Sequence, residues 1–204
     1  MSHPSFFKKQ RAFTIMELSI ALVIVLLLLG ATAPFVVRYR GKSSVNTSIE
    51  VCKAVIERAG EIAKTAGYPI PKEIKQNGVS DQGATELAEG SDLSLRIRKR
   101  LGSGAPLTLV SQKLLSSSTT LSANFQQLGY LDLEADTDIS GVFVEFVETS
   151  AGDPERVLCT LPIDVNGEFA LYGNSSKATV TLGYGHYRRV LELTQRGTVT
   201  LERR

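Results

Sequence analysis

The chain has 204 residues, of which 43% are hydrophobic and 22% charged, enough for one membrane-spanning helix and one domain of moderate size. The formal net charge of +2 excludes a strongly basic protein that binds nucleic acid over its whole surface. His3 and His186 are the only histidines, and no phosphate-binding or dinucleotide-binding glycine motif is found. We therefore expect neither an enzyme nor a bound cofactor.

The first predicted element is a membrane-length apolar segment. From Phe13 to Val37 there are 25 residues, and Glu17 is the only ionisable one among them. A helix of about 20 apolar residues spans a bilayer. An acid inside such a segment costs roughly 2.5–3.5 kcal/mol, so Glu17 is expected to have a function and a partner.

A cut between Ala12 and Phe13 would supply that partner. The new α-amino group of Phe13 would be a cation four residues before Glu17. One helical turn is about 3.6 residues, so the amine and the carboxylate would lie close together within one chain. The amine of one chain could also meet the carboxylate of a staggered neighbour.

These residues resemble the N-terminus of type IV prepilins and type II secretion pseudopilins. The match is Phe13-Thr14-Ile15-Met16-Glu17-Leu18, preceded by the basic leader residues Lys8, Lys9 and Arg11. Pro34 lies 21 positions after Phe13, where many pilins carry a proline that loosens the helix. The chain departs from the family at Ala12, where glycine is usual before the cut.

The resemblance implies a non-enzymatic filament subunit that prepilin peptidase cuts between Ala12 and Phe13, with Phe13 and Glu17 guiding assembly. Its partners would be other pilin or pseudopilin subunits, an inner-membrane assembly platform and membrane lipid. The subunit would cross the inner membrane once, with a cytoplasmic N-terminus and a periplasmic or extracellular C-terminal domain, before joining a cell-surface filament. Loss of leader residues 1–12 would leave 20 Lys and Arg against 21 Asp and Glu, a formal charge of −1.

Two other interpretations of the N-terminus compete with this one. A secretory signal peptide could be cut after Ala31-Thr32-Ala33, but Pro34 would follow the cut and Glu17 would have no explanation. An ordinary single-pass anchor could carry a binding domain that never polymerises. Basic residues flank the segment on both sides, so the orientation rests on the resemblance.

The apolar segment continues into an amphipathic helix over residues 38–66. Its apolar residues recur at spacings of four and three, which defines one narrow helical face: Val45, Ile49, Cys52, Ile56, Ala59, Ala63 and Ala66. Gly67 is a suitable C-cap and the prolines that follow stop the helix. Residues 13–66 thus predict one helix about 80 Å long, with a break or bend near Gly30, Pro34 and Gly41.

Residues 67–130 are predicted to be an irregular region of mixed structure. Within it, Leu93–Arg100 alternates apolar and polar residues and ends in a basic run. This pattern is typical of an edge strand, of a solvated charged segment, or of a loop that contacts phosphates or lipid headgroups.

Residues 131–204 predict an antiparallel sheet, because short turns separate runs that alternate in polarity. The expected strands are Gly141–Glu148, Arg156–Ile163, Ala178–Leu182, Tyr187–Thr194 and Thr198–Glu202. An apolar sheet face needs cover, and the stripe from Val45 to Ala66 supplies it. The predicted fold class is α+β, a long N-terminal helix packed across an antiparallel sheet, which agrees with the ladle shape of pilins.

Two sets of residues are candidates for bonds or ligands. Cys52 and Cys159 lie on opposite partners of the expected core, where they could form a disulfide or remain as buried thiols. Asp132, Glu134, Asp136 and Asp138 alternate like calcium ligands, and some pseudopilins bind calcium. The glycine of the hand-loop pattern is missing, so we expect a solvated acidic turn and no metal.

The C-terminus resembles the end of GspH/FimT-type minor pilins, some of which use a Gly-Arg-x-Arg motif in DNA uptake. The candidate DNA contacts are the arginines at this end: Arg188, Arg189, Arg196, Arg203 and Arg204. Here Arg196-Gly197-Thr198 breaks the motif, and a structural hairpin is the favoured interpretation. The irregular middle and the terminal sheet favour a minor over a major subunit.

Overall fold

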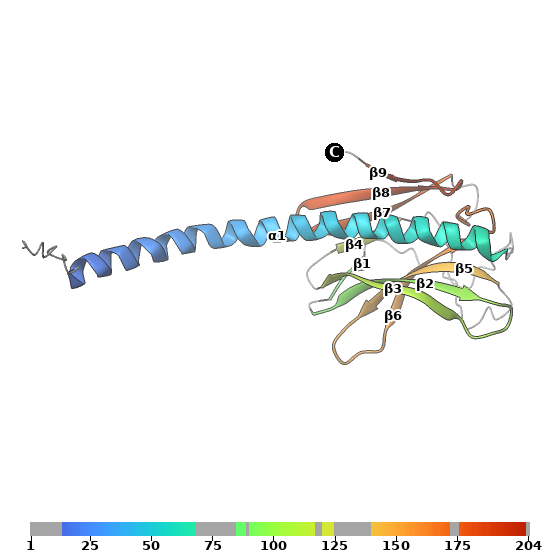
Figure 1. Cartoon of the computed structure of the whole chain (residues 1–204), viewed down its shortest axis with the longest axis horizontal. Coiled ribbons are helices and arrows are strands. Elements are labelled where there is room, and N and C mark those ends of the chain that lie inside the picture. Colours follow the sequence, from blue (N-terminus) through green and yellow to red (C-terminus); the bar gives the residue numbers. More distant parts are fainter. Residues whose placement is uncertain are drawn as a thin grey trace, which may run out of the picture. The chain divides into compact units, whose positions relative to one another are not determined.

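A computed structural model describes residues 14–67, 85–88, 90–116, 120–124, 140–171 and 176–202. The chain divides into two compact units, Met1–Arg40 and Gly41–Arg204. Helix α1 (Ile15–Ala66) contributes to both units (Figure 1). It ends at Gly67, whose φ of 68° is the left-handed conformation that glycine adopts readily at a C-cap.

Helix α1 has Pro34 in its interior and continues through it, so Gly30 and Pro34 do not interrupt the helix, and the bend expected near them stays a prediction. A proline inside a helix removes one backbone donor, and its ring crowds the carbonyl four residues earlier. The carbonyl that loses its partner belongs to Gly30, four residues earlier. The neighbouring turns keep their hydrogen bonds, and the helix persists.

The second unit contains two antiparallel sheets beside the C-terminal part of α1 (Figure 1). The five-stranded sheet has the order β1 (Thr85–Glu86), β4 (Thr120–Asn124), β7 (Lys177–Tyr184), β8 (Tyr187–Thr194) and β9 (Val199–Leu201). The four-stranded sheet has the order β3 (Leu107–Ser116), β2 (Asp92–Arg100), β5 (Gly141–Thr149) and β6 (Arg156–Ile163). The α+β class is confirmed, but the single meander is wrong, since the chain changes sheet between β6 and β7.

The buried face of α1 is wider than the predicted stripe, and this explains how one helix covers two sheets. Ser48 and Val55 are buried in addition to the predicted residues, of which Ala66 is half-buried. The Ser48 hydroxyl donates to the carbonyl of Leu114 in β3 at 2.7 Å. On the other side, the Tyr187 hydroxyl of β8 donates to Asn46 Oδ1 at 2.8 Å. The helix and both sheets share one apolar core.

The segment Leu93–Arg100 is neither an edge strand nor a solvated loop. It forms most of β2, which pairs with β3 on one side and β5 on the other. Leu93, Leu95 and Ile97 are fully buried in the core. The alternation does mark a strand, and Arg96 and Arg98 lie on the face of this interior strand opposite the buried leucines and Ile97.

Candidate functional site

The N-terminal end of α1 is closed by a reciprocal pair of hydrogen bonds between Thr14 and Glu17. Glu17 Oε2 accepts from the Thr14 amide at 3.0 Å and from Thr14 Oγ1 at 3.1 Å. In return, the Glu17 amide donates to Thr14 Oγ1 at 3.2 Å. This is a capping box, in which two donors of the first turn that lack helical partners are satisfied.

Thr14 is thus a partner of Glu17 in its own chain, in addition to the Phe13 amine that the sequence predicts. The spacing Thr14-x-x-Glu17 before an apolar run is the sequence signal for this capping box. A carboxylate in the first turn also faces the positive end of the helix dipole. Ala12 and Phe13, on either side of the predicted cut, lie outside the described residues.

The apolar part of α1 exposes its side chains on every side. Each large apolar residue between Ile15 and Val37 is 43–86% exposed, and the helix is long and apolar enough to cross a membrane. The hydroxyls of Ser19 and Thr32 donate to the carbonyls of Ile15 and Leu28 at 2.9 and 3.0 Å. These polar groups are therefore satisfied within the helix and do not need water.

Cys52 and Cys159 are buried and unbonded in the structure, which is the second of the two alternatives that the sequence left open. Both belong to the core shared by the helix and the sheets. Burial raises the pKa of Cys52 to about 12 and raises the pKa of Cys159 well above its ordinary 9.0.

The candidate DNA-contacting arginines do not gather at one place. Arg188 and Arg189 are neighbours on β8 and so point to opposite faces of the sheet. Arg188 is exposed, whereas Arg189 is half-buried. Arg196 is exposed in the turn after β8, and the part of the strand that separates Arg188 from this turn, up to Thr194, is about 20 Å long. Arg203 and Arg204, like the acidic series from Asp132 to Asp138, lie outside the described residues.

Arg96 and Arg98 of β2 are engaged in a charge cluster that the sequence did not reveal. Glu145 of β5 is fully buried and pairs with Arg96 at 3.6 Å and Arg98 at 3.2 Å. Arg96 also pairs with the exposed Glu155. Two of the five residues in the stretch Arg96–Arg100 thus neutralise a buried acid, which weakens the prediction that this run contacts phosphates.

Residues 7–33 match the family model described as the prokaryotic N-terminal methylation motif. The chain therefore carries the prepilin-type cleavage and methylation signal, which fits the type IV prepilin and pseudopilin family. The motif supports a pilin-like or pseudopilin subunit, a structural protein rather than an enzyme, that assembles with other pilin subunits after processing by prepilin peptidase. Comparisons with curated proteins and with solved structures find no match.

Proposed function

We propose that the chain is a minor structural subunit of a type IV pilus or a type II secretion pseudopilus, released from its leader by a cut between Ala12 and Phe13. The observation that carries this proposal is the methylation motif at residues 7–33, which leads directly into a helix with exposed apolar side chains on all sides. A soluble domain would bury that surface.

The same surface suits both environments that such a subunit meets. Before assembly, the apolar side chains contact lipid tails, and the helix satisfies its own backbone groups there. After extraction, they would be stable only if packed against equivalent helices, because exposure to water costs about 25 cal/mol for each Å². Polymerisation supplies that packing. An anchor that does not polymerise would have no such packing outside the membrane.

Glu17 would supply the register of assembly. Its carboxylate stands in the first turn of α1, and the amine of an incoming subunit's Phe13 is the cation that the cut creates. Burying an acid in an apolar filament core is expensive unless it is paired. Correctly staggered neighbours would thus be favoured over misaligned ones.

N-terminal sequencing and intact mass of the mature protein test the cut. The chain should be co-expressed with an active prepilin peptidase and, as a control, with a catalytically inactive one. We expect the mature chain to begin at Phe13, with one added methyl group, only with the active enzyme. A chain that begins at Pro34 would instead show a secretory signal peptide and would contradict the proposal.

The composition of sheared filaments, or of the purified pseudopilus, tests whether the chain is a minor subunit. We expect the chain to co-purify in small amounts with a more abundant pilin or pseudopilin, whose identity also separates a pilus from a secretion system. A dominant band of this chain would overturn the minor assignment. Its absence from the filaments would favour the non-polymerising anchor.

A further inference from the structure

The turn between β7 and β8 is fixed to the first part of α1 that belongs to the second unit. The ring of Tyr184 lies over Gly41, where a Cβ atom would overlap it. The Tyr187 hydroxyl donates to Asn46 Oδ1 at 2.8 Å, and Lys42 Nζ lies 5.6 Å from the centre of the Tyr187 ring, a cation–π contact. The turn and this part of the helix therefore form one surface.

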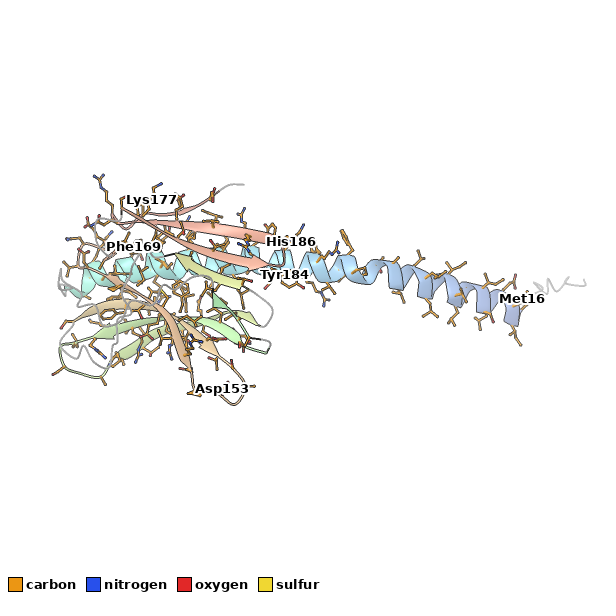
Figure 2. All side chains as sticks on the ribbon, turned by 180° about the vertical axis from the view of Figure 1, so that it is seen from behind. Met16, Asp153, Phe169, Lys177, Tyr184 and His186 are labelled. Atoms are coloured by element: carbon orange, nitrogen blue, oxygen red, sulfur yellow. The ribbon has the colours of Figure 1, made fainter. Side chains whose placement is uncertain are left out.

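This surface combines tyrosine rings with exposed cations. His186 and Gly185 form the exposed tip of the turn, with Tyr184 beside it in Figure 2. Lys42 and Arg188 are exposed, and the nearest described acid beyond Lys42 on α1 is Glu50, two turns or about 12 Å further along. Tyrosine is enriched at membrane–water interfaces, where its ring meets the acyl boundary and its hydroxyl meets the headgroups.

The length of chain fixes how far this surface can lie from a bilayer core. Val37 is the last residue of the apolar segment, and Gly41 follows four residues later. Four residues span about 6 Å in a helix and at most about 14 Å when fully extended. The headgroup layer on each side of a bilayer is about 5–8 Å thick. Gly41, and the tyrosine packed on it, must then lie at or just outside the headgroups.

We propose that Lys42 and the β7–β8 turn, Tyr184 to Arg188, form a docking surface for anionic phospholipid headgroups. Lys42 and Arg188 attract the lipid phosphates, and the tyrosines rest at the boundary. The contact holds the globular unit at the membrane before assembly and is released when the subunit leaves the bilayer. The inference rests on the proposed function only in that the apolar segment must be inserted in a bilayer.

Position-specific fluorescence quenching in proteoliposomes tests the contact with the full chain. His186→Cys places a thiol at the tip, and Gln195→Cys places a matched exposed thiol just beyond the other end of β8, a strand about 23 Å long. The native thiols are buried, so a maleimide fluorophore labels only the new position. Vesicles of phosphatidylcholine with or without phosphatidylglycerol carry a small fraction of lipid with a nitroxide on its headgroup.

We expect strong quenching at position 186, weak quenching at position 195, and an increase at 186 alone when phosphatidylglycerol is present. Arg188→Gln should lower the ratio of docked to undocked molecules about fivefold. The matched variant Lys177→Gln removes an exposed cation at the far end of the same sheet and should leave the ratio unchanged. High salt should also lower the ratio of docked to undocked molecules, because salt screens the attraction between the exposed cations and the lipid phosphates.

Equal quenching at positions 186 and 195 would overturn the docking surface. If quenching at position 186 changes neither when phosphatidylglycerol is added nor in the Arg188→Gln variant, recognition of anionic headgroups is overturned. Flotation of the vesicles separates these results from failure of the proposed function, since a chain that does not float with lipid is not inserted. A chain that floats and docks but never enters filaments would refute the proposed function and leave this inference standing.

Discussion

At the scale of single residues, Glu17 combines two tasks that need different properties of one side chain. The capping box needs an acceptor for the Thr14 amide, which either glutamate or glutamine supplies. Pairing with a neighbour's amine needs a negative charge, which glutamine lacks. Substitutions at Thr14 and Glu17 can therefore separate the stability of the helix end from the register of the filament.

We expect Glu17→Gln to insert in the membrane and to be processed, yet to fail in assembly or lose register, because it keeps the cap and removes the charge. Glu17→Ala should behave likewise, with insertion intact or improved. Thr14→Ala should assemble, because the carboxylate remains, although the first turn loses about 1 kcal/mol of capping. Counting each variant in sheared filaments relative to the membrane fraction measures this. Wild-type incorporation of Glu17→Gln would refute the role of the charge.

The buried thiols predict how stability responds to alkaline pH. In the unfolded chain a cysteine ionises near its ordinary 9.0, whereas folded Cys52 ionises near 12. The unfolded state therefore loses its proton first, and stability should fall as the pH rises from about 9 to about 12. Urea unfolding of Cys52→Ser beside the unaltered chain checks this. A wild-type chain whose pH dependence matches that of Cys52→Ser across this window would contradict the assignment.

At the scale of elements, the sequence predicted the strands that have short turns and clear alternation. The bounds of β6 and β8 agree with the prediction, and β5 differs by one residue at its end. The two-sheet arrangement could not be predicted, because a period of two shows that a strand has two faces but not which partner covers each. The buried Glu145 illustrates this, since the alternation does not show that Arg96 and Arg98 of β2 cover the face on which it lies.

Two glycines of α1 offer a matched test of close packing between the helix and the β7–β8 turn. An alanine at Gly41 would overlap the Tyr184 ring, whereas the nearest atom to an alanine Cβ at Gly60 is 3.9 Å away. Gly41→Ala should cost about 1–3 kcal/mol through overpacking, and Gly60→Ala should be neutral or stabilise by up to about 1 kcal/mol. Thermal unfolding of the detergent-solubilised chain compares them, and equal melting temperatures would contradict the contact.

The charge cluster between β2 and β5 predicts a large difference between two glutamates. Glu145→Ala leaves Arg96 and Arg98 without their buried partner, which should cost about 3 kcal/mol, the lower end for broken buried pairs, because both arginines are about one-fifth exposed. Glu155→Ala removes a partner that is 56% exposed and should cost less than about 1 kcal/mol. Urea unfolding of both variants measures the difference. Similar costs would show that the cluster contributes little.

At the scale of the whole molecule, charge decides what surfaces the mature chain can bind. A chain cut after Ala12 has a formal charge of −1, so any attraction to a polyanion must come from local groups of cations. Arg96 and Arg98 are paired with a buried acid. Arg188 and Arg196 lie near opposite ends of β8. The distribution favours contact with a flat, mobile array of lipid headgroups over a continuous track along a duplex.

We therefore expect duplex DNA to bind the full chain weakly, without sequence preference, and only at low salt. Even if four phosphates were neutralised, the slope of log affinity against log salt would be about −3.6, and the separation of Arg188 from Arg196 should make it shallower. Titration of a fluorescent duplex at several salt concentrations measures the slope, with Arg188→Gln and Arg196→Gln each reducing it by about 0.9. A steeper slope, or binding that survives both changes, would show that another basic surface binds DNA. No binding at low salt would remove DNA uptake from the functions of this chain.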